Sequence, residues 1–105
     1  MMKRQSMLKK GDGMVWIEEI KLRAAMNKKG DALHYLAKAA RSMENVKGLT
    51  KTKILTHAFL VNDFSFQLVW DTETPEEPGS EEGLKLRTVL KQFGLVSHDV
   101  WIKER

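Results

Sequence analysis

Glu18 and His57 are the two ionisable residues that strand periodicity places among apolar neighbours. Side chains alternate between the two faces of a strand, so both are predicted on the face that receives the helices. Burying either group without a partner costs roughly a few kcal/mol, so each requires a hydrogen bond, an opposite charge, water or a ligand. We expect the pair to lie across one strand, about 9–10 Å apart at two strand spacings.

That separation is too long for a direct bond, and it suits two groups that hold one small molecule. Glu18 and His57 are therefore the predicted catalytic residues, with His57 as the acid or base. The alternative is structural, with His57 bonded in the core to backbone or water and Glu18 reaching the rim of the sheet.

Aromatic residues near this pair predict a pocket for a flat ligand, lined by Trp16, Phe66 and Trp70. His98 would join it from the last strand, and Tyr35 would bring its hydroxyl from the first helix. Each has a plainer alternative: the three aromatic residues pack the core, His98 ends a strand in solvent, and Tyr35 lies on the surface.

The longest extended stretch is a hairpin, residues 54–61 and 64–70 around Asn62 and Asp63. Both turn residues tolerate positive φ, which favours a two-residue turn and fixes the register. The predicted pairs are Val61 with Phe64, Phe59 with Phe66, His57 with Leu68 and Leu55 with Trp70.

The other elements follow from periodicity and capping signals. Residues 14–24 alternate as a strand, with a helix as the alternative, and residues 32–43 form an amphipathic helix after a turn and cap at 27–31. Ser80 caps a second helix that Gly94 ends, after an acidic loop, and a strand follows at 96–103. This order predicts an α+β, ferredoxin-like βαββαβ fold with a four-stranded antiparallel sheet and two helices on one face.

Composition sets limits on function. The 105 residues suffice for one domain, expected at 14–105 after a flexible basic leader at 1–13 that contributes most of the net charge of +4. The chain has no cysteine, which excludes disulfides and thiol chemistry and favours the cytoplasm. No run is long enough to span a membrane. The three histidines, His34, His57 and His98, lack metal-ligand spacing, so no metal is predicted. The sequence has no glycine-rich phosphate loop, and no other cofactor is predicted.

The second face of the sheet is predicted to be apolar too. In the hairpin it would carry Ile54, Thr56, Ala58, Leu60, Ser65, Gln67 and Val69, with Val15, Ile17 and Trp101 from the outer strands. Such a surface on a small monomer favours a homodimer with packed sheets, against the alternative of scattered surface hydrophobes.

Gly48-Leu49 leads into the second strand, and Leu68-Val69-Trp70 closes the third before an acidic loop and an amphipathic helix. With this element order, the chain resembles the dimeric α+β barrel superfamily, in particular antibiotic-biosynthesis-monooxygenase-like domains. The resemblance implies a homodimer with a pocket between sheet and helices. It further implies that some relatives oxidise aromatic substrates with oxygen alone. Haem-degrading relatives use an Asn, a Trp and a helical His; here only Trp70 matches, Glu18 replaces the Asn, and the second helix has no histidine.

The sequence thus predicts a small homodimer that binds an apolar or aromatic small molecule, with cofactor-independent monooxygenation as one outcome. A ligand-binding module without chemistry and a purely structural dimer remain alternatives. RNA binding is a further one, because Phe64 and Phe66 on a third strand could stack bases. It is disfavoured because no basic excess accompanies them and because they share the helix-facing side of the sheet.

Overall fold

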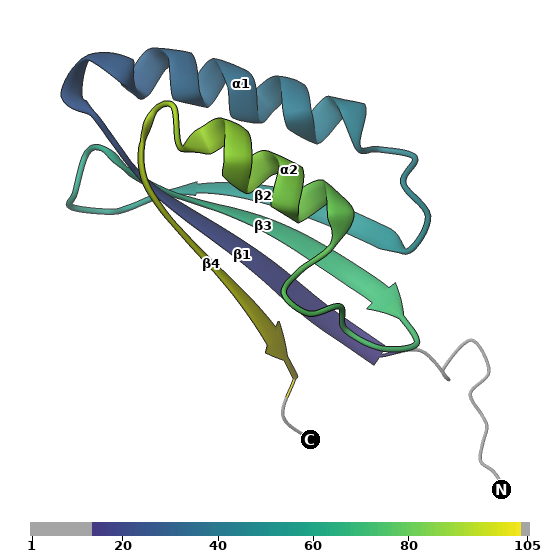
Figure 1. The fold of residues 1–105 in the computed structure, drawn as a ribbon. Coiled ribbons are helices and arrows are strands. Elements are labelled where there is room, and N and C mark those ends of the chain that lie inside the picture. Colours follow the sequence, from purple (N-terminus) through teal and green to yellow (C-terminus); the bar gives the residue numbers. More distant parts are fainter. Residues whose placement is uncertain (1–13, 104–105) are drawn as a thin grey trace, which may run out of the picture.

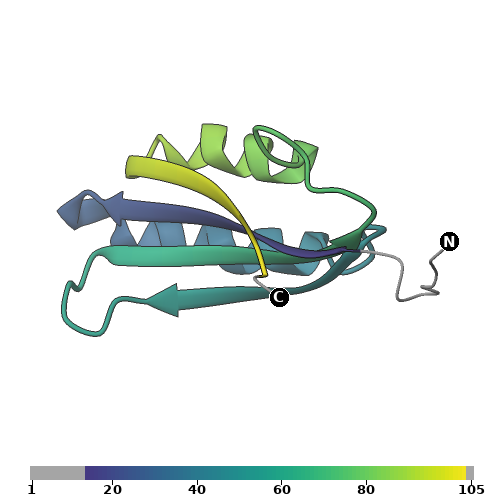
Figure 2. The same ribbon diagram turned by 90° about the horizontal axis from the view of Figure 1, so that it is seen from below.

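The computed structural model describes residues 14–103, and the predicted leader at 1–13 lies outside them. The elements are β1 (Met14–Ala24), the 3-10 turn η2 (Met26–Lys28), α1 (Lys29–Ser42), β2 (Leu49–Thr56), β3 (Asp63–Thr72), α2 (Glu81–Leu90) and β4 (Gly94–Ile102). The strands pair antiparallel in the order β2-β3-β1-β4. Figures 1 and 2 show both helices on one face of the sheet. The predicted ferredoxin-like α+β fold is confirmed.

β1 is a strand because its residues alternate strictly between the core and the outer face. Every second side chain is buried, namely Trp16, Glu18, Ile20, Leu22 and Ala24. A helix would scatter these residues around its surface, so the helical alternative for 14–24 is wrong. β1 also lies in the middle of the sheet, between β3 and β4, which puts Glu18 in the centre of the core.

The helices cover the inward face of the sheet, α1 against β2 and α2 against β1 and β4. α1 begins at Lys29, earlier than the predicted start at residue 32, because the η2 turn leads directly into it. α2 has the predicted cap: Ser80 Oγ accepts a hydrogen bond from the Gly83 backbone N–H at 2.9 Å. Gly94 does not end this helix as predicted. It begins β4, where a Cβ would collide with the backbone of Arg23.

The register of the β2–β3 hairpin differs from the prediction. Leu68 pairs with Thr52 instead of His57, a shift of five positions, and residues 57–62 form the connection instead of Asn62 and Asp63 alone. His57 holds this longer connection closed, because its Nδ1 accepts hydrogen bonds from the backbone N–H groups of residues 59 and 60, both at 3.0 Å. An odd shift reverses the faces of a strand, so every predicted orientation on β2 is inverted.

This inversion makes the outer face of the sheet, the face away from the helices, more polar than predicted. β2 contributes Lys51, Lys53 and Leu55 to it, in place of the expected Ile54, Thr56, Ala58 and Leu60. Across the strands, one row is largely apolar, with Val69, Ile17 and Trp101 beside Lys51. The predicted outward residues of β2 are therefore wrong, and the apolar part of the outer face is one band.

Candidate functional site

The carboxylate of Glu18 is completely buried and is the centre of a polar cluster inside the core. Its Oε1 accepts hydrogen bonds from Ser80 Oγ at 2.6 Å and from Trp70 Nε1 at 3.1 Å. Its Oε2 accepts one from the Ser80 backbone N–H at 3.0 Å and lies 2.6 Å from His98 Nε2. A carboxyl group that accepts three hydrogen bonds and contacts a histidine ring nitrogen can be buried without the large cost of an unpaired polar group.

The cluster joins elements that are far apart in the sequence. Glu18 comes from β1, Trp70 from β3, Ser80 from the start of α2 and His98 from β4. Two glycines leave room for the carboxylate, since a Cβ on Gly79 or Gly83 would overlap Glu18 Oε2. The cluster therefore connects three strands to the N-terminus of a helix, where a negative charge is also favourable.

His98 is a predicted pocket residue, and the sequence placed it on the correct face by parity but did not predict its contact with Glu18. It was predicted on the inward side of the last strand, with a solvent-exposed strand end as the alternative. Its side chain is 2% exposed, so that alternative is wrong. Its backbone pairs with Ile20, and the imidazole reaches diagonally to Glu18. A search of neighbouring strands for ionisable residues of equal parity would have found the pair.

The structure does not bring His57 to Glu18. His57 lies beyond the end of β2 in the exposed connection, where its Nδ1 is occupied by the two backbone N–H groups. The predicted Glu18–His57 pair across β3 is wrong for the same physical reason as the register: the connection is longer than a two-residue turn.

Trp16, Phe66 and Trp70 lie on the inward face but fill the core instead of lining an open pocket. Each is at most 4% exposed. The two indoles stack with their ring centroids 5.6 Å apart and an interplanar angle of 16°. Trp16 Nε1 donates to Thr72 Oγ1 at 2.8 Å, as Trp70 Nε1 donates to Glu18. Both indole donors are thus satisfied within the chain, so the predicted aromatic pocket is closed in this conformation.

An open groove of about 540 Å³ lies instead between the two helices, and we call it the inter-helix groove. Its apolar part comes from Ala39, Met43, Val46 and Leu86, and its polar part from His34, Tyr35, Lys38, Ser42, Glu82 and Lys85. Tyr35, a predicted pocket residue, is half-buried there, and this partial burial raises the pKa of its phenol. The groove therefore offers apolar surface with a single phenolic hydroxyl.

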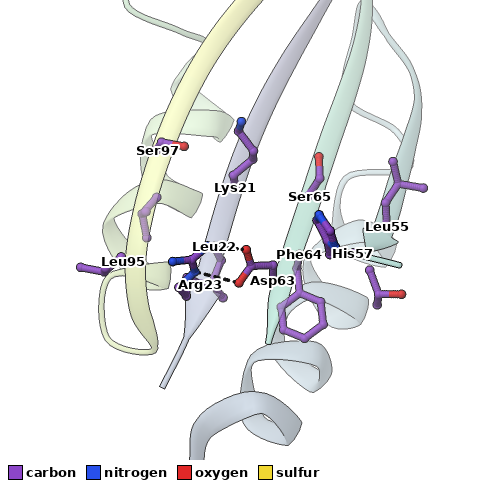
Figure 3. A pocket seen from close by; sticks show the side chains of 12 residues that line it. Lys21, Leu22, Arg23, Leu55, His57, Asp63, Phe64, Ser65, Leu95 and Ser97 are labelled. Carbon is purple, nitrogen blue, oxygen red and sulfur yellow. Dashed lines mark hydrogen bonds and ion pairs between the residues drawn. The ribbon is translucent and has the colours of Figure 1, made fainter. Parts of the chain in front are cut away.

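A second hollow of about 520 Å³ lies on the outer face of the sheet (Figure 3). Arg23 and Asp63 form two parallel hydrogen bonds across it, both 3.0 Å long. The hydrogen bond from Arg23 lowers the pKa of Asp63 below its usual value, and the same contact raises that of Arg23. Lys21 lies between Ser65 and Ser97 in the strand register. His57 lines this hollow, on the opposite face of the sheet from Glu18.

Neither hollow contains a cluster of residues that could bind a metal ion. Among residues 14–103, no three histidine, aspartate, glutamate or cysteine side chains gather closely enough to hold a metal ion. No helix in the same range is long and apolar enough to cross a bilayer.

No protein-family model and no curated protein sequence matches this chain. The structure is nevertheless similar to several solved structures. A conserved protein from Methanosarcina mazei Go1 has a TM-score of 0.69 at 8% identity, over 89% of this chain and 96% of that one. A candidate antibiotic biosynthesis monooxygenase from Nitrosomonas europaea has a TM-score of 0.67 at 12% identity, over 87% and 91% of the two chains.

A third similar structure is a point variant of SnoaB, a cofactor-independent oxygenase from Streptomyces nogalater. Its TM-score is 0.61 at 13% identity, over 90% of this chain and 96% of that one. Identities this low establish a shared fold and leave activity open. The resemblance predicted from the sequence is confirmed: this chain has the fold of antibiotic-biosynthesis-monooxygenase-like domains.

Proposed function

We propose that the protein is a homodimer that binds an apolar or aromatic small molecule in the inter-helix groove. The observation that carries this proposal is the groove itself, a concave and mainly apolar surface of about 540 Å³ between α1 and α2. That volume lies within the range of small-molecule sites, which are typically apolar with few polar groups. The groove lies between α1 and α2 and no residue of the described strands lines it, so it differs from the binding region that the sequence predicts between sheet and helices.

Tyr35 gives the groove a means of orienting its ligand. A phenol combines an apolar ring with one polar end, and the ring of Phe93 lies 6.1 Å away from that of Tyr35. A ligand with one carbonyl or hydroxyl group would hydrogen-bond the Tyr35 hydroxyl while its apolar part covers Leu86 and Met43. We infer a preference for flat molecules of this type.

We further propose that the ligand is a substrate for oxygenation without a cofactor. The support is the shared fold with SnoaB and with the monooxygenase candidate. The second candidate function is binding without turnover, and the closed Trp16–Trp70 stack favours it. Oxygen consumption with a quinol as the probe distinguishes oxygenation from binding without turnover. Only an oxygenase raises the rate of oxygen consumption above the rate measured without protein.

The homodimer would form through the apolar band of the outer sheet face. Trp101, 55% exposed, lies beside Ile17 in register, and Val15 is also exposed at the same end of β1. Charged residues of both signs surround the band, among them Lys51, Glu19 and Asp99. Such a surface can pair with its own copy, because opposite charges meet across a two-fold axis. The predicted cytoplasmic location stays a prediction.

RNA binding loses its structural basis. Phe64 and Phe66 are 3% and 1% exposed, and they face the helices. Bases stack on aromatic rings that lie open on a sheet, and these rings do not.

The direct test of the groove is binding of N-phenyl-1-naphthylamine, a neutral apolar dye whose fluorescence rises in apolar surroundings. Ser42 lines the groove and is exposed, so Ser42→Phe fills part of the site without disturbing the core. We expect this variant to bind the dye about tenfold more weakly, or ~1.4 kcal/mol. Arg41→Phe is the matched control, since Arg41 is the exposed neighbour that does not line the groove. Equal affinity in both variants contradicts the proposal.

A further inference from the structure

His98 has one ring nitrogen that nothing in the described chain uses. Its side chain is 2% exposed and its Nδ1 is buried, yet this atom has no hydrogen-bond partner among residues 14–103. Buried polar atoms are nearly always paired, and His98, whose Nδ1 is not, also lines a hollow, so this residue marks a place for a ligand group. The other ring nitrogen, Nε2, lies 2.6 Å from Glu18 Oε2.

The open space is a hollow of about 500 Å³ at the β4 edge of the sheet, which we call the His98 hollow. One wall is the segment that precedes α2, with Pro75, Glu76, Glu77 and Pro78, and the other is β4, with His98, Asp99 and Val100. It shares no lining residue with the inter-helix groove or with the outer hollow. A ligand in either of those sites would therefore leave the His98 hollow open.

The hydrogen-bond pattern fixes what His98 can do. Glu18 accepts from the Ser80 and Trp70 donors, and its Oε2 shares one hydrogen with His98 Nε2. When this hydrogen is on Nε2, a neutral imidazole has its lone pair on Nδ1. This is the arrangement of a histidine base whose orientation and tautomer a buried carboxylate sets.

We propose that His98 is a general base that takes a proton from the acidic hydroxyl of a neutral aromatic molecule in the His98 hollow. Glu18 is its positioning residue. In the step, the ligand O–H bond breaks and a bond from Nδ1 to that hydrogen forms. The products are a phenolate and an imidazolium whose Nε2–H remains bonded to Glu18, and the total charge of the complex is unchanged.

The charges at the hollow select among ligands. Glu76, Glu77 and Asp99 line it and carry negative charge, whereas no lysine or arginine is among its lining residues. A carboxylic acid ligand would enter as an anion against these three groups, which costs affinity. The two prolines provide apolar surface for a ring. The ligand class is therefore a neutral phenol or enol and not an aromatic acid.

The test uses 4-nitrophenol, whose colour reports its ionisation, at a pH where the free probe is mostly neutral. With the wild-type chain we expect saturable appearance of the phenolate band. We expect His98→Gln to lose that band, because glutamine can still donate to Glu18 but cannot accept the proton. Glu18→Gln should weaken the band, and His57→Gln, which removes a histidine on the other face, should keep it. The proposal is overturned if the wild type does not bind 4-nitrophenol, or binds it without forming the phenolate band. It is also overturned if His98→Gln gives the same phenolate band as the wild type.

Two further measurements keep the proposal falsifiable if a core variant does not fold. In the wild-type chain, nitrogen-15 NMR of His98 should show an unprotonated Nδ1 that becomes protonated when 4-nitrophenol binds. An Nδ1 signal that does not change on binding contradicts the role of His98 as a base. The exposed variant Glu77→Lys should bind 4-nitrobenzoate more tightly than the wild type, and no gain overturns the charge selection. We expect His98→Gln to bind N-phenyl-1-naphthylamine as tightly as the wild type. This measurement distinguishes a wrong assignment of His98 from a wrong assignment of the inter-helix groove.

Discussion

Gly83, in the first turn of α2, lies directly against the carboxylate of Glu18 on β1. A Cβ built on Gly83 would overlap the carboxyl carbon and both oxygens of Glu18. The absence of a side chain lets the helix N-terminus approach close enough for Ser80 to donate two hydrogen bonds to the same carboxylate. The position of α2 on the sheet therefore depends on one glycine and one buried acid.

The first prediction tests this packing with Gly83→Ala. The added methyl group must displace a buried, fully hydrogen-bonded carboxylate, so we expect a loss of about 3 kcal/mol or more in the free energy of unfolding. Gly30→Ala is the matched control, because Gly30 lies in α1 with no atom within 4 Å of its Cβ position. Alanine there should stabilise by about 0.5–1 kcal/mol. Urea unfolding of both variants gives the comparison, and equal effects would refute the packing.

The second prediction concerns Glu18→Gln against Glu19→Gln. Glu18 Oε1 faces the Trp70 indole N–H and Oε2 faces the Ser80 backbone N–H, so an amide NH2 at either position meets a donor that cannot accept. We expect a loss of about 1–3 kcal/mol in unfolding free energy. Glu19, on the opposite face, accepts one hydrogen bond from Ser65 at 2.9 Å, so its variant should remain within about 0.5 kcal/mol of the wild type. Similar losses of unfolding free energy in the two variants would contradict a special role of Glu18 in stabilising the fold.

The element order, the helix caps and the inward face of β1 could be predicted from the sequence because they depend on local periodicity. Trp16, Ile20 and Leu22 alternate with polar residues, and Ser80 is followed by acidic residues, so each signal lies within a few positions. The β2–β3 register could not be predicted in this way. It depends on a histidine that caps its own loop and on a backbone hydrogen bond of 2.9 Å from Ala24 to Asn62.

The candidate site was only partly predictable for a related reason. Glu18 and His98 are 80 positions apart, and their contact is diagonal between neighbouring strands. Parity assigns both to the inward face, but it does not give the register between the first and last strands that brings the two side chains into contact. Residues 59–61 are predicted to be strand because Asn62 and Asp63 favour a two-residue turn, yet Phe59 is exposed in the structure.

The third prediction uses the only tyrosine of the chain. Burial raises the pKa of Tyr35, so its contribution to stability is fully present below the ordinary tyrosine pKa of about 10. It is lost as the pH rises through the higher pKa of the folded state. Absorbance of tyrosinate during an alkaline titration reports this residue alone, and N-phenyl-1-naphthylamine should raise its midpoint further by excluding water. A midpoint that the dye does not move would place the dye elsewhere.

The fourth prediction concerns Arg23 and Asp63. The hydrogen bond from Arg23 lowers the pKa of Asp63, so the contribution of the pair to stability is present above the ordinary aspartate pKa of about 3.9. It is lost as the pH falls through the lower pKa of the folded state. Asp63→Asn should have a slightly lower melting temperature than the wild type at pH 6, and the difference should shrink as the pH falls below the ordinary aspartate pKa. If the difference in melting temperature persists in acid, the variant acts through packing and not through the charge of Asp63.

The fifth prediction tests the homodimer and the groove together, by native mass spectrometry of the full chain with added N-phenyl-1-naphthylamine. We predict a species of twice the 12.1 kDa chain mass that carries dye, with the dye lost in Ser42→Phe and retained in Arg41→Phe. A species at 12.1 kDa, or a dimer whose dye survives Ser42→Phe, would contradict the account.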